Sequence, residues 1–420
     1  MLSAQEILKK KRDACSLTEK EIEYFIKEHL KGSIPDYQVA ALLMAIYLQG
    51  MNVDETHWLT KAMMNSGKVL DLSDISGVKV DKHSTGGVGD KVSLIVAPLL
   101  ASLGFVIPMI TGKALGHTGG TVNKLRAITG FRTNLSLCEF KNNLSKIGLS
   151  IIEATDEIVP ADKSLYALRN ATATIDSIPL IAASIMSKKL AEGVDVLVLD
   201  VKTGNGAFMK EQSKAKQLAK VLVEIGKRMN KRVAALITNM ESPLGKSVGT
   251  GLEIQEAINV LKGVEKSYDL LEVVYGITRK ILELTNIDGN PKAKIEDGTA
   301  LIKLKELVQA QGGNLSRIED SEYFSSTREI TEIKSTQTGY IFSMNTHRIG
   351  LLANSLISDP FAGFVFNLKT GNKVRKGDLL ATIYSSDKAE GIRIGDELLE
   401  CYEIRDYPPV IEPMIIEVIE

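Results

Sequence analysis

From about residue 75 onward, short β-branched runs alternate with helical patterns, and this alternation constrains the fold more than any other feature. Four runs have strand character: GVKVDKH, FVIPMI, VDVLVLDVK and RVAALIT. Helical segments such as DKVSLIVAPLLASLG and KQLAKVLVEIGKRM lie between them. Strands that alternate with helices form a mainly parallel sheet covered by helices. The pattern therefore predicts an α/β fold for the middle of the chain.

The two ends of the chain have a different texture. Residues 1–66 have helical periodicity throughout, and Ser3 with Glu6 fits a capping box at a helix start. After about 325, short strands and turn-forming glycines indicate a β-rich module. We expect an N-terminal helical domain (1–66, completed by about 160–193), an α/β domain (67–159 and 194–330) and a C-terminal β-rich (α+β) module (331–420).

Composition limits the classes of partner. Lys and Arg number 51 against 52 Asp and Glu, which gives a net charge of −1. This balance predicts neither a nucleic-acid nor a membrane-surface partner. The three cysteines lie far apart, and the N-terminus shows no apolar segment like that of a secretory signal. We expect a cytoplasmic protein that uses a small molecule.

Two glycine-rich segments each carry a histidine, then Ser or Thr, then a Gly-Gly pair: residues 82–90 (KHSTGGVGD) and residues 116–121 (GHTGGT). The first follows a predicted strand and precedes a predicted helix, an arrangement that directs backbone N–H groups at an anion. Such glycines also occur as plain tight turns, but the repeated pattern favours a phosphate site. The candidate phosphate-binding residues here are Lys82, Ser84, Gly86, Gly87, Ser93 and Thr121.

Other nucleotide motifs are not found. Neither glycine segment is a Walker A loop or a G-x-G-x-x-G dinucleotide loop. No cluster has zinc-ligand spacing, and no G-x-S-x-G motif is present. We therefore expect no organic cofactor, with inorganic phosphate as a substrate.

A second group of polar residues lies in the helical segment after residue 160. Ser184 and Lys188 are four residues apart and share one helix face, and Arg169 precedes them. A hydroxyl and two cations beside Ile181 and Ile185 suit the polar edge of a planar base, although a lone lysine of this kind is usually a surface residue. His83 is a candidate general acid or hydrogen-bond donor.

These motifs together resemble the thymidine phosphorylase and pyrimidine-nucleoside phosphorylase family. The resemblance is carried by DKHSTGGVGD, GHTGGT, PADK-x-x-YA-x-R and SIMSKKLAEG-x-D-x-x-x-x-DVKTG-x-GAFM, and it covers essentially the whole chain. It implies a homodimer formed through the helical domain, with a cleft between the helical and α/β domains. It also implies phosphorolysis of thymidine, uridine or deoxyuridine to a free base and a (deoxy)ribose 1-phosphate.

The resemblance assigns roles to individual residues. It adds Thr111 and Lys113 to the phosphate site, and places Leu115 and Tyr166 beside Arg169, Ser184 and Lys188 around the base. His83, Arg169 and Lys188 are then the catalytic residues, which stabilise negative charge on the departing base. Phosphate attacks C1′ with inversion.

Several positions depart from the family pattern, namely Thr111, Lys113, Ala114, Asn123, Ala154 and Asn170. They leave the preferred base and sugar open. Two alternatives also stay open: a phosphoribosyltransferase of the same fold, and a catalytically weak nucleoside-binding homologue. The first needs acidic magnesium ligands, and no acidic pair lies near the glycine loops.

One departure concerns a metal. Relatives with this loop bind a monovalent cation, potassium, through the carbonyl at the position of Gly89 and a threonine at the position of Lys91, with Leu244, Ser247 and Glu256 contributing. In this chain the threonine position is Lys91. We expect the ammonium of Lys91 to replace the ion, donating hydrogen bonds to backbone carbonyls such as that of Gly89 and pairing with Glu256. The alternatives are a solvent-facing Lys91 with the ion retained, or no ion at all.

Overall fold

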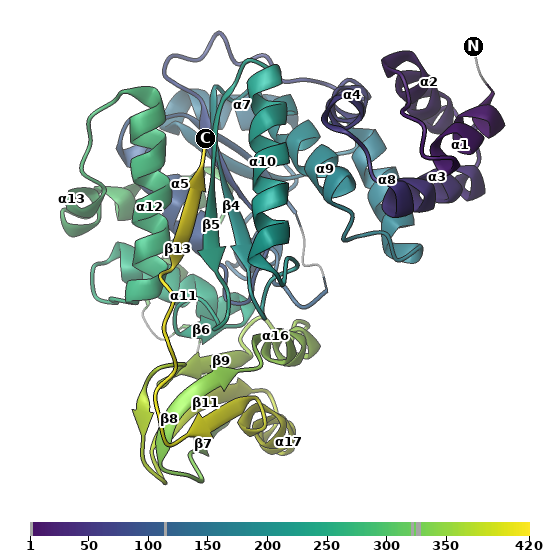
Figure 1. The fold of residues 1–420 in the computed structure, drawn as a ribbon. Coiled ribbons are helices and arrows are strands. Elements are labelled where there is room, and N and C mark those ends of the chain that lie inside the picture. Colours follow the sequence, from purple (N-terminus) through teal and green to yellow (C-terminus); the bar gives the residue numbers. More distant parts are fainter. Residues whose placement is uncertain (1–2, 113–115, 321–322, 325–328) are drawn as a thin grey trace.

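The computed structural model describes residues 3–112, 116–320, 323–324 and 329–420. It has three parts: a central α/β unit, a helical bundle on one side of that unit (right in Figure 1), and a β-rich module beneath it (Figure 1). This is the predicted fold class.

The helical bundle is built from two stretches of the chain. Its helices are α1 (Ala4–Arg12), α2 (Glu19–Leu30), α3 (Asp36–Gln49), α4 (Val53–Met64), α8 (Pro160–Ala171) and α9 (Ile178–Ala191). Helix α9 packs on α4, and α8 packs on α2, α3 and α4. The capping box of Ser3 and Glu6 is confirmed at the start of α1. The single helical segment expected after residue 160 is two helices, because residues 172–177 turn between them.

The α/β unit contains a parallel sheet. Its strands are β1 (Val80–Ser84), β2 (Ile107–Thr111), β3 (Leu149–Glu153), β4 (Val196–Thr203) and β5 (Arg232–Asn239). Strands β1, β4 and β5 pair in parallel, as do β2 and β3. A backbone hydrogen bond of 2.9 Å from Val80 to Val106 joins the two groups. The carboxyl ends of parallel strands meet at one edge, where ligands usually bind.

Helices cover both faces of this sheet. They are α5 (Val92–Ser102), α6 (Thr121–Arg126), α7 (Leu137–Ile147), α10 (Gln212–Arg228), α11 (Thr250–Leu261), α12 (Tyr268–Thr285), α13 (Pro291–Glu296), α14 (Thr299–Ala310) and α15 (Ser316–Glu319). Along β4, Val196 and Val198 face the core with α5 and α12. Leu197 and Leu199 face the opposite core with α9 and α10. Burial on both faces explains the unbroken apolar run of this strand.

The C-terminal module contains two small antiparallel sheets and two helices. Its elements are β7 (Glu329–Lys334), β8 (Gly339–Met344), α16 (Thr346–Ser355), β9 (Gly363–Phe366), β10 (Lys373–Val374), β11 (Leu379–Ser385), α17 (Lys388–Leu399) and β12 (Tyr402–Arg405). One sheet borrows β6 (Ser247–Val248) from the α/β unit. The last strand, β13 (Ile415–Ile419), returns to pair with β5 and lies at the edge of the central sheet (Figure 1).

The exchange of strands fixes the C-terminal module to the α/β unit at two places. None of the described helices is long and apolar enough to cross a membrane.

Candidate active site

A cleft of about 540 Å³ lies between the helical bundle and the sheet. This is the size of a small-molecule site. Eleven of the residues singled out from the sequence line it: Lys82, His83, Ser84, Gly86, Ser93, Thr111, Thr121, Tyr166, Arg169, Ser184 and Lys188. Gly87 lies in the same loop but is buried behind the lining, whereas Lys113 and Leu115 are outside the described residues.

The sheet side of the cleft presents an unpaired cation. Lys82 is on β1 and only 2% exposed, and its Nζ has no hydrogen-bond partner among the described residues. Burial lowers the pKa of Lys82, while the nearby Asp90 and Asp200 oppose that shift. Burial of an ammonium with free donors costs free energy unless an anion accepts its hydrogen bonds. The position suits a phosphate oxygen.

A set of charged residues behind Lys82 was not predicted from the sequence. Lys202 Nζ donates to Asp200 Oδ2 over 2.8 Å and lies 3.9 Å from Asp90 Oδ2. Burial favours the neutral form of Asp90, but the cations of Lys202 and Lys82 hold the pKa of Asp90 below its usual range. Asp90, Asp200 and Lys202 therefore set the electrostatic field around Lys82. Their only signal in the sequence is an Asp and a Lys inside the apolar run of β4.

The helical side of the cleft presents donors to a planar ligand. Arg169 on α8 is anchored by Nη1 to Leu180 O (3.2 Å) and by Nη2 to Ile175 O (2.6 Å). Its Nε has no partner among the described residues. On α9, Lys188 Nζ donates to Ser184 Oγ over 3.0 Å, as the four-residue spacing predicts. The ring of Tyr166 lies 5.7 Å from the Arg169 guanidinium carbon.

Asp162 is a further residue of this side that the sequence reading missed. Its Oδ2 accepts a short hydrogen bond from Lys188 Nζ, and its Oδ1 has no partner within the described chain. Asp162 is 7% exposed and lines the cleft. The carboxylate therefore fixes the direction of the Lys188 ammonium.

His83 lies between the two sides. Burial lowers its pKa well below the usual range, and the cations of Lys189, Lys188 and Lys82 add to this effect. The imidazole is therefore neutral near pH 7. In that state it donates one N–H and carries no charge, so a role as hydrogen-bond donor fits better than a role as a charged acid.

The ammonium of Lys91 lies among the oxygens that the family resemblance assigns to a monovalent cation. Lys91 is 0% exposed, and Nζ donates to Leu244 O (2.7 Å), Ser247 O (2.8 Å) and Glu256 Oε2 (2.8 Å). All three donors are thus used. Gly89 O accepts from the backbone N–H of Lys91 instead of from Nζ. These residues do not fit a bound potassium ion, because the ammonium holds the same oxygens and would repel it.

Gly89 shows why this loop approaches the cage so closely. Its φ is +74°, and a Cβ there would lie 2.6 Å from Leu244 O. Only glycine fits this position without strain.

Burial would raise the pKa of Glu256, yet Lys91 holds it below the usual range, so the pair is ionic.

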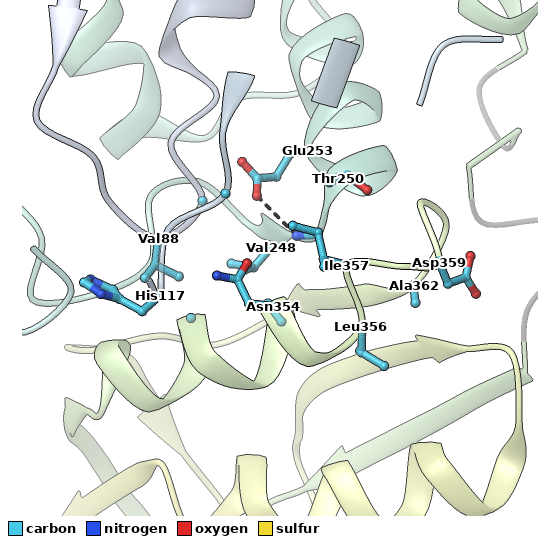
Figure 2. Close-up of a pocket in the computed structure, with 15 residues that line it drawn as sticks. Val88, His117, Val248, Thr250, Glu253, Asn354, Leu356, Ile357, Asp359 and Ala362 are labelled. Atoms are coloured by element: carbon cyan, nitrogen blue, oxygen red, sulfur yellow. Dashed lines mark hydrogen bonds between the residues drawn. The ribbon is translucent and has the colours of Figure 1, made fainter. Parts of the chain in front are cut away.

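A second pocket lies behind the 116–121 segment and is too small for a substrate. Figure 2 shows it between Val88, His117 and Glu253 of the α/β unit and Asn354 of α16. It has space of about 20 Å³, close to that of one water molecule. His117 Nε2 donates to Gly206 O over 2.9 Å, so His117 supports its turn and does not line the cleft.

Comparison with known proteins supports this arrangement. Residues 76–302 match a family model described as the a/b domain of a glycosyl transferase family, and residues 5–67 match its helical bundle domain. Residues 340–405 match a model described as the pyrimidine nucleoside phosphorylase C-terminal domain.

Two relatives and one solved structure extend the match. The chain is 43% identical to a pyrimidine-nucleoside phosphorylase of Geobacillus stearothermophilus, over 91% of this chain and 92% of the relative. It is 42% identical to one of Staphylococcus aureus, over 98% and 99%. An anthranilate phosphoribosyltransferase of Thermus thermophilus shares the fold, with a TM-score of 0.55 and 18% identity over 72% of this chain and 98% of that chain. The chain belongs to the pyrimidine-nucleoside phosphorylase family.

Proposed function

We propose that this protein cleaves pyrimidine nucleosides with inorganic phosphate, releasing the base and a pentose 1-phosphate. One observation carries the proposal: the unpaired, buried ammonium of Lys82 lines the same cleft as Arg169, Ser184 and Lys188. An anion on the sheet side and a base on the helical side are the two substrates of that reaction.

The residues divide the chemistry between them. A phosphate oxygen held by Lys82, Ser84, Ser93, Thr111 and Thr121 attacks C1′ and forms the new C–O bond. The electron pair of the breaking glycosidic bond moves into the pyrimidine, and its charge develops at a carbonyl oxygen. Arg169, Lys188 and the N–H of His83 stabilise that charge by hydrogen bonds in a closed site.

Substrate mixtures test the proposal. The protein is incubated with uridine, thymidine and deoxyuridine, each with and without phosphate, and base release is followed by absorbance. Release that depends on phosphate supports a phosphorylase. Nucleoside binding without release would instead indicate a catalytically weak homologue.

We propose further that Lys91 acts as a built-in replacement for a monovalent cation. The three hydrogen bonds of Nζ join the loop before α5 to the 244–247 segment and to α11. The chain therefore needs no potassium to hold this loop.

We also propose a homodimer formed through the helical bundle, in the reducing cytoplasm that its three free cysteines suit. Helix α3 exposes four large side chains: Tyr37 (74%), Met44 (38%), Tyr47 (40%) and Leu48 (70%). Apolar residues gathered on one exposed helix are typical of a surface that another protein covers. A symmetric dimer would bury them.

A further inference from the structure

Three buried ionisable side chains meet at the wall of the cleft, where Lys189 is part of the lining, and none of them was assigned a role in the proposed reaction. Lys189 Nζ donates to Asp81 Oδ2 (2.6 Å), Ile110 O (2.8 Å) and Glu192 Oε1 (2.8 Å). Asp81 and Glu192 are 0% exposed and Lys189 is 1% exposed. Glu192 Oε1 also accepts from the backbone N–H of Ile110 over 3.1 Å.

Each carboxyl group in this cluster has one oxygen left over. Asp81 Oδ1 and Glu192 Oε2 are buried, and neither has a donor among the described residues. Both carboxyl groups are bound by the same Lys189 Nζ, at 2.6 Å and 2.8 Å, so they lie side by side around one ammonium. Two carboxylates would place acceptor against acceptor and leave one uncompensated negative charge beside Lys189. One proton between them satisfies both oxygens and makes the cluster neutral.

We propose that Glu192 is a neutral carboxylic acid that donates its O–H to Asp81. We propose also that this neutral cluster positions β1, the strand that carries Lys82 and His83. The proton is assigned to Glu192 because Asp81 makes the shorter contact with the Lys189 ammonium, 2.6 Å against 2.8 Å. Burial, followed by the charge of Asp81, raises the pKa of Glu192 well above its usual range, although Lys189 opposes the shift.

The location of the cluster defines its role. Asp81 precedes Lys82 and His83 on β1, and Ile110 precedes Thr111 on β2. Lys189 follows Lys188 on α9. The cluster therefore joins three segments that each carry a residue of the cleft, and Glu192 is a positioning residue. This positioning role rests on the proposed function, whereas the protonation of Glu192 does not.

The substitution Glu192→Gln tests the protonation. Gln keeps an acceptor for Lys189 and a donor for Asp81, so the variant folds. Unfolded glutamate loses its proton above about pH 4.3, while folded Glu192 retains it. Unfolding of the wild type then releases a proton. The stability of the wild type relative to E192Q therefore falls as pH rises, and its unfolding equilibrium constant increases about tenfold per pH unit.

The measurement is the difference in melting temperature between E192Q and the wild type from pH 5 to pH 8. We expect the difference to grow steadily in favour of E192Q. Asp81 of β1 and Lys189 of α9 are the charged groups that face Glu192. A constant difference, or failure of E192Q to fold, would overturn the protonation of Glu192.

A matched control uses the same exchange at another buried glutamate. Glu256 is 4% exposed and pairs with Lys91 as an ion. E256Q should therefore lower the melting temperature by an amount that is the same from pH 5 to pH 8.

Kinetics test the positioning role. We expect E192Q to keep kcat/KM within about threefold of the wild type, and Glu192→Ala to raise the phosphate KM at least tenfold, because Lys82 and Thr111 lose their support. Val274→Ala in the core of α12 serves as a variant of lowered stability with an intact cluster. If E192A and V274A show the same phosphate KM, Glu192 has no positioning role. A wild type without phosphate-dependent turnover would refute the proposed function and leave the melting test valid.

Discussion

At the scale of single residues, the base side of the cleft depends on two cations with fixed directions. Backbone carbonyls anchor Arg169, and Asp162 with Ser184 holds Lys188. We expect Arg169→Ala and Lys188→Ala each to lower kcat/KM by a factor that corresponds to about 2.7–4 kcal/mol of transition-state stabilisation, the loss typical of one donor at a developing negative charge. Lys216→Ala on the surface of α10 is the control. Full activity in both cleft variants would place the base elsewhere.

The sequence predicted these residues better than their partners. Ser184 and Lys188 share a helix turn, so their spacing alone predicts the contact. Asp162 is 26 residues away from Lys188 in the chain. Such a contact depends on how α8 packs against α9, which local pattern does not specify. The protonation of Glu192 likewise depends on three segments that meet only in the fold.

At the scale of elements, the proposed role of Lys91 is to hold two loops and a helix together as a bound cation would. We expect wild-type activity to be equal in potassium, sodium and choline salts. Lys91→Thr removes the ammonium and leaves Glu256 buried without its partner, which is strongly destabilising. The activity of this variant in a choline salt should be at least tenfold below that of the wild type, and added potassium should restore it.

A potassium requirement in the wild type would contradict this account of Lys91. An equal loss of activity by K91T in sodium, potassium and choline salts, with no rescue by potassium, would also contradict it.

Element type was predictable where periodicity is strong, as in the strand–loop–helix unit of β1 and α5. Connections between distant elements were not. Strand β13 reads as the end of the C-terminal module, but it pairs with β5 because its apolar residues cover the edge of the central sheet. Helices α16 and α17 were also not located individually, since their segments lie among strong turn and strand signals.

At the scale of the whole molecule, the exposed face of α3 predicts the assembly. Leu48→Glu places a charge on that face and should convert a dimer to a monomer, as measured by light scattering on a sizing column. Val264 is similarly exposed, at 72%, in the loop between α11 and α12. Helix α12 lies on the side of the α/β unit away from α3 (Figure 1). Val264→Glu should therefore stay dimeric. Equal masses for wild type and L48E would exclude this face as the interface.

The central claim is that phosphate, held by Lys82, is the nucleophile that displaces the base. Phosphorus NMR of the reaction with uridine or thymidine tests it most directly, with Lys82→Ala run in parallel. We predict one pentose 1-phosphate formed for each base released by the wild type, and at least a hundredfold slower formation by K82A, in line with the loss of a charged contact in the transition state. Base release without phosphate consumption, or undiminished turnover by K82A, would contradict the claim.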